Sequence, residues 1–323
     1  MSDKQKQQLY VRTPLIESTA LSKHAPFKVY LKLENTQPTG SFKIRGISNL
    51  CKKAIEKGSK HIVSSSGGNA GIAAAYAARK LGVKATVVIP KSTPEFVAQK
   101  LRDENATVEY HGKVWDEANK RALEIASQSN GTIIHPFDHP DIWQGHSSMI
   151  EEIADDMTHK PDVLITVVGG GGLFCGVIEG LKKVGWNDVP VITIETVGAD
   201  CYNAAVKKGE LVTLDDITSV AKCLGALTAC QQALDYYSQH EVHSVVISDK
   251  EAVDACLRFT DEHRILVEPA CGAALAGIYS NVIPKLQEQG KLQTVIQSAV
   301  VIVCGGCSIT LEMLNKYKSK FGL

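Results

Sequence analysis

Short runs rich in Val and Ile recur along the chain, and most of them end at Gly or Pro. They predict buried strands at Ala85–Ile89, Thr132–His135, Val163–Val168, Val189–Glu195 and Ala299–Cys304. Between these runs, stretches such as Ala70–Gly82 and Trp115–Gln128 have the apolar spacing of helices. The alternation of strands and helices predicts an α/β fold whose parallel sheets are covered by helices on both faces.

The composition is that of a globular protein with a sizeable core. The chain has 323 residues, of which 44% are hydrophobic and 22% are charged, enough for one large domain or two medium ones. Lys plus Arg and Asp plus Glu number 35 each. Because the net charge is zero, nothing favours nucleic acid or an anionic membrane as a partner.

The chain also lacks the sequence signals of export or membrane insertion. No apolar run is long enough to predict a transmembrane helix, and the N-terminal MSDKQKQQLY lacks the apolar core of a signal peptide. The nine cysteines are scattered and odd in number, which is typical of reduced thiols rather than of a disulfide framework. We therefore expect a cytoplasmic protein.

Loops of small residues follow three of the apolar runs. They are Ser64–Gly71 (SSSGGNAG), Gly169–Gly172 (GGGG) and Cys304–Ser308 (CGGCS). A fourth segment, around Lys43, follows the strand-like run Val29–Glu34. Ligands of open α/β sheets bind beyond the carboxyl ends of the strands. We therefore expect these four segments to converge on one cleft.

The four glycines of Gly169–Gly172 lie between a predicted strand and a predicted helix start. They allow positive φ angles and let several N–H groups converge on one point, and the helix N-terminus that follows favours an anion. No Gly-Lys-Ser/Thr follows, so the segment is not a Walker loop. A flexible turn would need only one or two glycines, so we favour a phosphate site.

The other segments leave more than one interpretation open. Ser64–Gly71 suits a bound carboxylate as well as it suits a helix N-cap. Lys43 has no acidic residue within eight positions on either side, and a lysine whose pKa is lowered in an apolar pocket condenses with aldehyde cofactors. The pattern alone still favours a surface lysine in a first helical turn. The CGGC of Cys304–Cys307 lacks the second ligand pair that zinc needs, which disfavours a metal or redox role.

Taken together and in this order, the motifs resemble those of the fold-type II pyridoxal-phosphate (PLP) enzymes. Within them, the chain is similar to the animal serine dehydratase family, and Gly67 and GKVWDEAN match its serine dehydratase-like branch. The stretches that carry the resemblance span most of the chain: TQPTGSFKIRGI, SSGGNAGIAAAYAARKLG, GKVWDEAN, FDHPDIWQGH, VGGGGLFCGV, DITSVAK, ILVEPACGAALA and VVIVCGG.

The resemblance implies the architecture of the tryptophan synthase β-like fold: two parallel-sheet α/β domains with the cofactor in the cleft between them. Residues 1–40 and 140–323 would form the large PLP-binding domain, and residues 41–139 the small domain. It also implies a homodimer that acts on small amino acids in amino-acid degradation and gluconeogenesis. Neither nucleic acid nor a membrane is an expected partner.

The resemblance assigns a role to each matching residue. Lys43 would be the catalytic residue and would bind the cofactor covalently, Phe42 would pack on its ring, and Cys304 would lie at its pyridine nitrogen. The substrate carboxylate would be bound by Ser66, Gly68, Asn69 and Ala70. The full set of implied cofactor contacts is Phe42, Lys43, Asn69, Gly169, Gly170, Gly171, Gly172, Leu173, Cys223 and Cys304.

A cation site is implied as well. Its matching residues are Gly169, Glu195, Ala199, Cys201, Leu224 and Ala226. Relatives that bind a divalent ion have a second carboxylate at the position of Cys201. With Glu195 as the single carboxylate, we expect a monovalent ion such as potassium.

The implied reaction is the PLP-dependent deamination of L-serine to pyruvate and ammonia, and of L-threonine to 2-oxobutanoate and ammonia. Lys43 would remove the α-proton as a general base. Two alternatives stay open. One is serine racemase activity, which Gly67 disfavours because racemases have a serine there that delivers a proton. The other is a PLP-binding paralogue with little turnover.

Overall fold

A computed structural model describes residues 8–113 and 115–323, so Val114 in the motif GKVWDEAN lies outside the described residues. The described residues form two compact units. Unit 1 consists of the described residues up to Val11 together with Gln37–His146, and unit 2 consists of Arg12–Thr36 and Ser147–Leu323. The predicted domains, 1–40 with 140–323 and 41–139, stay a prediction, because a unit of contacts is not by itself a unit of folding.

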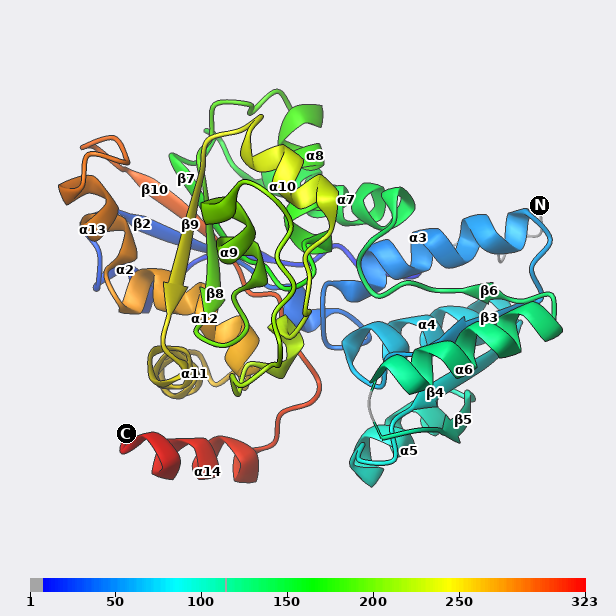
Figure 1. The fold of residues 1–323 in the computed structure, drawn as a ribbon. Helices are drawn as coiled ribbons and strands as arrows, with labels where there is room; N and C mark the ends of the chain where they lie inside the picture. The colour runs from blue at the N-terminus through cyan, green and yellow to red at the C-terminus, as the bar shows by residue number, and fades with distance from the viewer. Residues whose placement is uncertain (1–7, 114) are drawn as a thin grey trace. The chain divides into compact units, whose positions relative to one another are not determined.

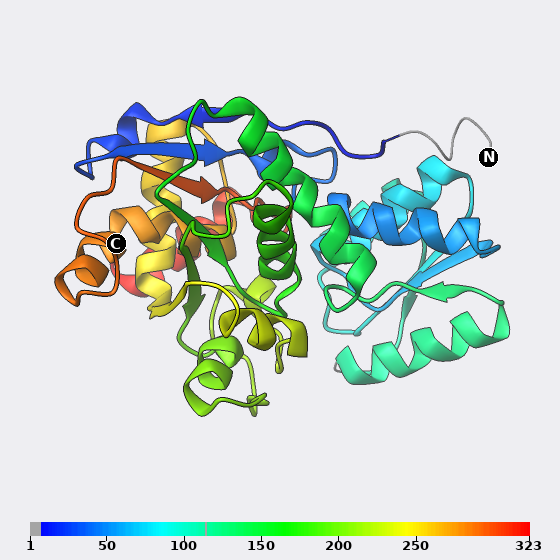
Figure 2. The ribbon, with the colours of Figure 1, turned by 90° about the horizontal axis from the view of Figure 1, so that it is seen from above.

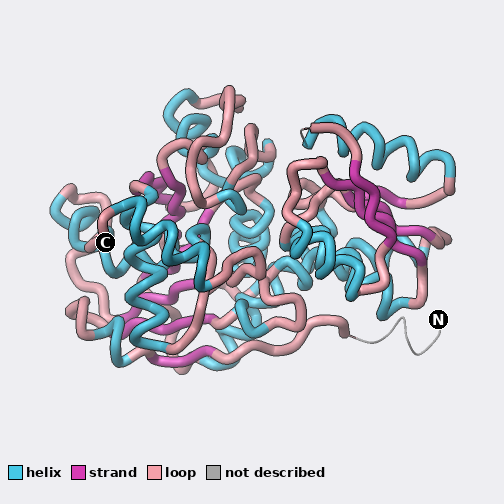
Figure 3. The backbone as a smooth tube through the Cα atoms, turned by 90° about the horizontal axis from the view of Figure 1, so that it is seen from below, coloured by secondary structure: helices cyan, strands magenta, loops and turns pink. Residues whose placement is uncertain are grey.

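Unit 1 is built on a parallel sheet of four strands in the order β5-β4-β3-β6. In Figures 2 and 3, α6 covers one face of this sheet, and α3 and α4 lie on the other. Its elements are α3 (Lys43–Glu56), β3 (His61–Ser64), α4 (Asn69–Leu81), β4 (Lys84–Ile89), α5 (Glu95–Asp103), β5 (Thr107–Tyr110), α6 (Trp115–Gln128) and β6 (Thr132–Ile133).

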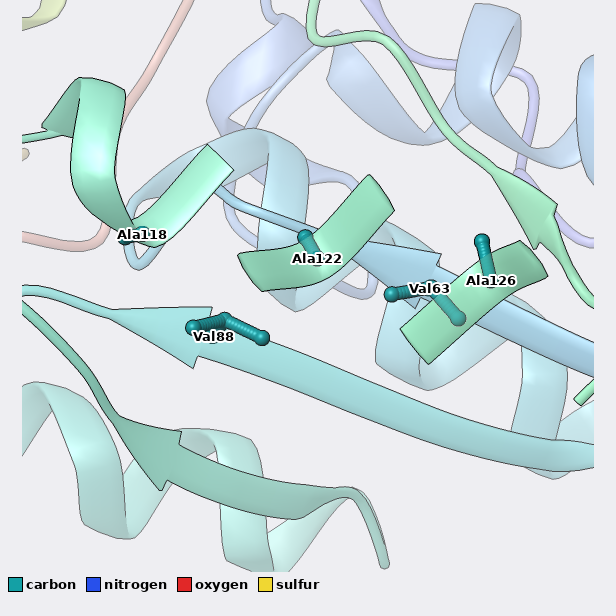
Figure 4. Packing of buried hydrophobic residues seen from close by; sticks show 5 residues of the cluster. All are labelled: Val63, Val88, Ala118, Ala122 and Ala126. Atoms are coloured by element: carbon teal, nitrogen blue, oxygen red, sulfur yellow. The ribbon is translucent and has the colours of Figure 1, made fainter. Parts of the chain in front are cut away.

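Alanines let α6 lie close to this sheet. Ala118, Ala122 and Ala126 recur every four residues and so share one face of the helix. Figure 4 shows them against Val63 of β3 and Val88 of β4, and all five are buried. Their methyl groups leave little distance between helix and sheet, which fixes the end of β3, where the Ser64–Gly71 loop begins.

Unit 2 is built on a sheet of six strands in the order β1-β2-β10-β7-β8-β9, of which all but β1 are labelled in Figure 1. All neighbours pair in parallel except β1, which is antiparallel to β2. The strands are β1 (Leu15–Glu17), β2 (Lys28–Lys32), β7 (Val163–Val167), β8 (Val191–Thr196), β9 (Val242–Ile247) and β10 (Ser298–Ile302). The central strands β7 and β8 are buried throughout, as expected for a sheet covered on both faces.

Helices cover both faces of the unit 2 sheet, and Figure 2 shows α8 and α11 on opposite sides of it. Helix α7 (Pro140–Asp156) begins in unit 1 and continues into unit 2. The other helices of unit 2 are α2 (Thr19–Ser22), α8 (Gly172–Lys183), α9 (Cys201–Lys208), α10 (Gln231–Tyr237), α11 (Asp249–His263), α12 (Pro269–Tyr279), α13 (Val282–Glu288) and α14 (Leu311–Phe321), with single 3-10 turns η1 (Glu34–Thr36) and η2 (Lys222–Leu224).

The predicted α/β architecture with two parallel sheets is confirmed, and each of the five predicted strands is present. The ends of some strands differ: β6 stops at Ile133, so His135 lies in a loop, and β8 begins only at Val191. Among the described residues no helix is long and apolar enough to span a membrane. All nine cysteines are free thiols.

Candidate active site

Lys43 is the first residue of α3, and Phe42 is the N-cap of that helix. Its amine donates a hydrogen bond to the carbonyl oxygen of Pro136 across 2.7 Å and lies 5.2 Å from the centroid of the Phe42 ring. The first turn of α3 has no acidic residue, and a helix N-terminus disfavours a nearby positive charge. The sequence pattern that raised the surface-lysine interpretation therefore belongs to a half-buried amine held by a carbonyl.

The predicted carboxylate loop precedes α4 in the same unit. Gly68 is the N-cap and provides no side-chain cap, while Asn69 and Ala70 are buried in the first turn. A Cβ on Gly71 would lie 1.6 Å from the carbonyl oxygen of Ser66. The loop therefore folds back so closely over position 71 that only glycine fits there. A Cβ on Gly68 would meet nothing within 4 Å. The loop thus presents the N-terminal N–H groups of a long helix beside open space, which suits a carboxylate.

In unit 2, the carbonyl groups of the glycine loop are held on one side. The thiol of Cys201 donates to the Gly169 carbonyl across 3.7 Å, and the Cys230 N–H donates to the Gly170 carbonyl across 3.0 Å. In a trans peptide the C=O and the following N–H point in opposite directions. The N–H groups of Gly170 and Gly171 therefore point away from these two cysteines.

Gly171 completes this loop as the N-cap of α8, with a φ of 96° and no side-chain cap. A Cβ at this position would lie 2.7 Å from Ala233 Cβ and 2.9 Å from Cys230 Sγ. The left-handed φ and the close contacts both require glycine here. The N–H groups of Gly172 and Leu173 open the helix, so the predicted phosphate-binding segment has the geometry of an anion site at a helix N-terminus.

Cys304 follows β10 and is buried. A hydrogen bond with Cys271 and burial raise the pKa of its thiol well above the usual range, so it carries its proton. Cys223, in η2, is exposed and lies near enough to raise the pKa of Cys304 further. A protonated thiol is a weak hydrogen-bonding partner for a ring nitrogen.

Sequence reasoning missed Glu268, which shapes the turn after Cys304. Its carboxylate accepts the N–H of Ser308 across 2.7 Å, and a Cβ on Gly306 would lie 2.3 Å from its Oε2. Glu268 is buried and is also the N-cap of α12. The motif ILVEPACGAALA contains this residue, but no spacing in the sequence connects it with residues 306–308.

The predicted cation ligands lie close together within unit 2. Glu195 and Cys201 are fully buried, Cys201 contacts the Gly169 carbonyl, and a Cβ on Gly169 would lie 3.1 Å from the Leu224 carbonyl oxygen. Ala199 lies shortly after the end of β8 at Thr196. The Leu224 carbonyl accepts the N–H of Ala226.

The electrostatics of this cluster centre on Glu195. Burial raises its pKa to about 8, against two N–H donors, Tyr202 and Asn203, that lower it. Burial likewise raises the pKa of Cys201 to about 12, so this thiol is neutral. Among the described residues no group of three or more His, Cys, Asp or Glu side chains could hold a metal ion. One carboxylate surrounded by carbonyls is a ligand set for a weakly bound, hard cation.

Comparison with known proteins shows which protein family this chain belongs to. The family model described as "Pyridoxal-phosphate dependent enzyme" matches residues 6–305. The chain belongs to the pyridoxal-phosphate dependent enzyme family.

Members with high similarity carry informative names. "L-serine dehydratase/L-threonine deaminase" of Bos taurus is 53% identical over 316 residues, which cover 98% of this chain and 97% of that protein. "Serine dehydratase-like" of Homo sapiens is 53% identical over 313 residues, covering 97% of this chain and 95% of that protein. The crystal structure of a fungal L-serine ammonia-lyase from Rhizomucor miehei matches with a TM-score of 0.91 at 36% identity, covering 98% of this chain and 100% of that one.

The residues present fit the cofactor that gives the family its name. PLP has an aldehyde, which needs an amine, and a phosphate, which needs converging N–H groups. Unit 1 brings together Phe42 and Lys43 at the start of α3 and, at the start of α4, the carboxylate loop. Unit 2 brings together the glycine loop, Cys304 with Cys223, and the cation cluster.

Proposed function

We propose that this protein is an L-serine/L-threonine ammonia-lyase that converts L-serine to pyruvate and ammonia and L-threonine to 2-oxobutanoate and ammonia. The observation that carries the proposal is the 53% identity, over 98% of the chain, to a protein named L-serine dehydratase/L-threonine deaminase. The half-buried amine of Lys43 at a helix start and the glycine loop before α8 support it, because the reaction needs an amine and a phosphate anchor.

Lys43 is the catalytic residue in this proposal. When bound, PLP supplies the electron sink that makes the α-proton of an amino acid acidic. The Lys43 amine would hold the cofactor through its aldehyde, and as a general base it would remove the α-proton of the substrate. The Pro136 carbonyl, which accepts a hydrogen bond from this amine, is a fixed point that orients Nζ.

The other proposed contacts divide by chemistry. Ser66, Gly68, Asn69 and Ala70 bind the substrate carboxylate through N–H groups at the start of α4, and Asn69 also meets the 3′-oxygen of the cofactor. Gly169, Gly170, Gly171, Gly172 and Leu173 bind the phosphate through N–H groups. Phe42 and Cys223 would contact the cofactor ring, and Cys304 would be the hydrogen-bonding partner of its pyridine nitrogen.

We further propose a potassium ion bound by Glu195 and the carbonyl groups of Gly169, Ala199, Cys201, Leu224 and Ala226. The contacts of Cys201 with the Gly169 carbonyl and of Gly169 with Leu224 support it. Because the Gly169 carbonyl belongs to the phosphate loop, an ion there would hold the loop in shape. The neutral Cys201 thiol adds no charge, which favours a monovalent over a divalent ion.

Racemase activity is the second candidate, and Gly67 weighs against it. This residue has no side chain to deliver a proton, and a Cβ here would lie 3.0 Å from Ile89 Cγ2 and 3.7 Å from Val97 Cγ1. Chiral chromatography of the products from L-serine should show little D-serine beside pyruvate. D-serine formed at a rate near that of pyruvate would favour the racemase instead.

A spectrum and an assay separate the ammonia-lyase from a paralogue with little turnover. Purified protein incubated with PLP should absorb visible light and release pyruvate from L-serine and 2-oxobutanoate from L-threonine, more so with potassium than with tetramethylammonium at equal ionic strength. Absorbance without keto acid would favour the low-turnover paralogue.

We also propose a cytoplasmic setting. The nine free thiols suit a reducing compartment such as the cytoplasm, where amino-acid degradation would supply keto acids for gluconeogenesis. The homodimer stays a prediction, which sedimentation or light scattering of the purified protein would check. The partners proposed are the small amino-acid substrates alone.

A further inference from the structure

The helix that presents Lys43 begins with a 3-10 turn. Helix α3 has Phe42 as its N-cap and no side-chain cap of its own. The N–H of Arg45 bonds back to the Phe42 carbonyl across 3.0 Å, three residues away, as in a 3-10 turn. In a regular α-helix that carbonyl would instead accept the N–H of Gly46. The Gly46 N–H therefore needs a different acceptor.

His146 of α7 is that acceptor. The Gly46 N–H donates to His146 Nδ1 across 3.2 Å, and the imidazole is fully buried. Because Nδ1 accepts, the ring is neutral and its proton lies on Nε2. Nε2 has no hydrogen-bond partner among the described residues, so the ring is held through Nδ1.

Two glycines bring the histidine to this position. A Cβ on Gly46 would lie 2.5 Å from the Ile142 carbonyl oxygen and 2.7 Å from His146 Cε1. A Cβ on Gly145 would lie 2.5 Å from the Arg45 carbonyl oxygen. The backbones of α3 and α7 thus touch where they cross. Any larger residue at either glycine would collide with backbone, so glycine is required for the close approach that brings His146 to the first turn of α3.

The same ring supports the other active-site residue at this turn. The His146 and Phe42 rings pack with centroids 4.9 Å apart at 58°. Phe42 and Lys43 are neighbours in sequence, and the Lys43 amine lies over the Phe42 ring. One buried imidazole therefore fixes a backbone N–H three residues after the lysine and an aromatic ring one residue before it.

We infer that His146 is a positioning residue for Lys43, acting through the Gly46 N–H and the Phe42 ring and touching neither substrate nor cofactor. The inference rests on the proposed function for its catalytic consequence, but not for its structural one. Without the acceptor, the Gly46 N–H loses its hydrogen bond, the first turn of α3 loosens, and the amine of Lys43 shifts. A displacement near 1 Å at a catalytic group lowers the rate by about 100-fold.

Two substitutions separate the acceptor from the ring. His146→Phe keeps an aromatic ring of similar shape beside Phe42 and removes the acceptor. His146→Asn removes the ring and places a carbonyl oxygen close to the position of Nδ1, so it keeps the acceptor. His61→Asn is the matched control, because His61 also lies in unit 1 and bonds through both ring nitrogens, to Ser129 and Thr86, but not to α3.

The first measurement is site-resolved amide hydrogen exchange at Gly46 in the full-length protein, with and without PLP. We expect exchange at least about 10-fold faster in His146→Phe, near wild type in His146→Asn, and unchanged in His61→Asn. Wild-type exchange in His146→Phe, or fast exchange in both His146 variants, overturns the inference. This readout needs no catalysis, so it stands even where wild-type protein forms no adduct at Lys43 and the proposed function itself fails.

The second measurement is steady-state kinetics with L-serine, together with the affinity for PLP. We expect His146→Phe to lower kcat by about 10–100-fold with little change in KM, because the carboxylate loop is untouched. His146→Asn should recover most of kcat. Equal losses in both variants, or a loss in KM alone, would assign His146 to the packing of the helices and contradict a positioning role.

Discussion

Two helices in this protein begin with similar backbone structure but present different chemical groups at their N-termini. Helices α3 and α8 both follow a loop, and neither has a side-chain cap from its own N-cap residue. In α3 a buried histidine from α7 accepts an N–H of the first turn, and the segment presents an amine. In α8 the neighbouring Cys201 thiol and Cys230 N–H bind carbonyl groups of the loop, and the segment presents N–H donors.

The difference shows how side chains far away in sequence decide what a helix start binds. An N-terminus with its N–H groups left facing outward attracts an anion. An N-terminus with an N–H bonded to an imidazole, and with a lysine as its first residue, instead presents an amine nucleophile. Substitutions at either start should therefore fail in different ways, and each prediction below uses a control from the same region.

Lys43→Ala should have the largest effect. Without the amine, no side chain in this turn removes a proton or binds an aldehyde, so pyruvate formation should fall by about 1000-fold or more. Lys52→Ala is the control, because Lys52 is half-buried on the same helix but in a later turn. Equal activity of the two variants in the pyruvate assay would remove Lys43 from the mechanism.

Gly171→Ala should come next, as it attacks the start of α8. The φ of 96° and the contacts with Ala233 and Cys230 add strain of about 1–3 kcal/mol and displace the loop, which should weaken PLP binding about 10–100-fold. Gly185→Ala is matched at the other end of α8: its φ is 75°, and a Cβ would meet nothing within 4 Å. PLP titration monitored by fluorescence should show normal affinity for Gly185→Ala, and similar losses in both would point to strain alone.

Acid should weaken unit 1 through His146. Burial, Lys43 and Arg45 lower the pKa of this imidazole well below 6.5. As the pH falls below about 6.5, the unfolded chain therefore binds a proton on this histidine, whereas the native state does not. The free energy of unfolding decreases as a result. His146→Asn has no such group, so its Tm should fall less than that of wild type between pH 7 and pH 5. Parallel pH profiles of Tm would show that His146 is protonated in the native state.

Glu195→Gln should have a smaller effect, confined to the potassium response. In wild type, potassium should raise Tm by about 2 °C relative to tetramethylammonium at equal ionic strength, because an ion bound only to the native state stabilises it. The variant lacks the charge and should lose this increment. An unchanged effect of potassium on the Tm of the variant would show that Glu195 does not bind the ion.

Gly67→Ser is the mildest change. The added Cβ lies 3.0 Å from Ile89 Cγ2, so we expect a loss of about 1 kcal/mol in the free energy of unfolding. Pyruvate formation should change little, and a trace of D-serine should become detectable by chiral chromatography. Urea unfolding measures the first quantity. Abundant D-serine formed by the wild-type protein would contradict the claim that racemisation needs a serine at position 67 to deliver a proton.

The sequence predicted those parts of the molecule that local pattern controls. Helix α6 has the predicted bounds, Trp115–Gln128, because its apolar period is unbroken, and the glycine loop begins where β7 ends. The resemblance to PLP enzymes, rather than the periodicity of the sequence, favoured a catalytic role for Lys43 over that of a surface lysine. His146 and Glu268 escaped prediction because each acts on a segment about 40 or 100 residues away, through contacts that only the fold creates.

The covalent attachment of PLP to Lys43 is the central claim, and one measurement tests it directly. Protein incubated with PLP is reduced with borohydride and digested, and the modified peptide is identified by mass spectrometry. The account predicts a phosphopyridoxyl group on Lys43, in the peptide that follows the Thr-Gly-Ser turn. A protein that binds no PLP, or a reduced adduct on any other lysine, would contradict it.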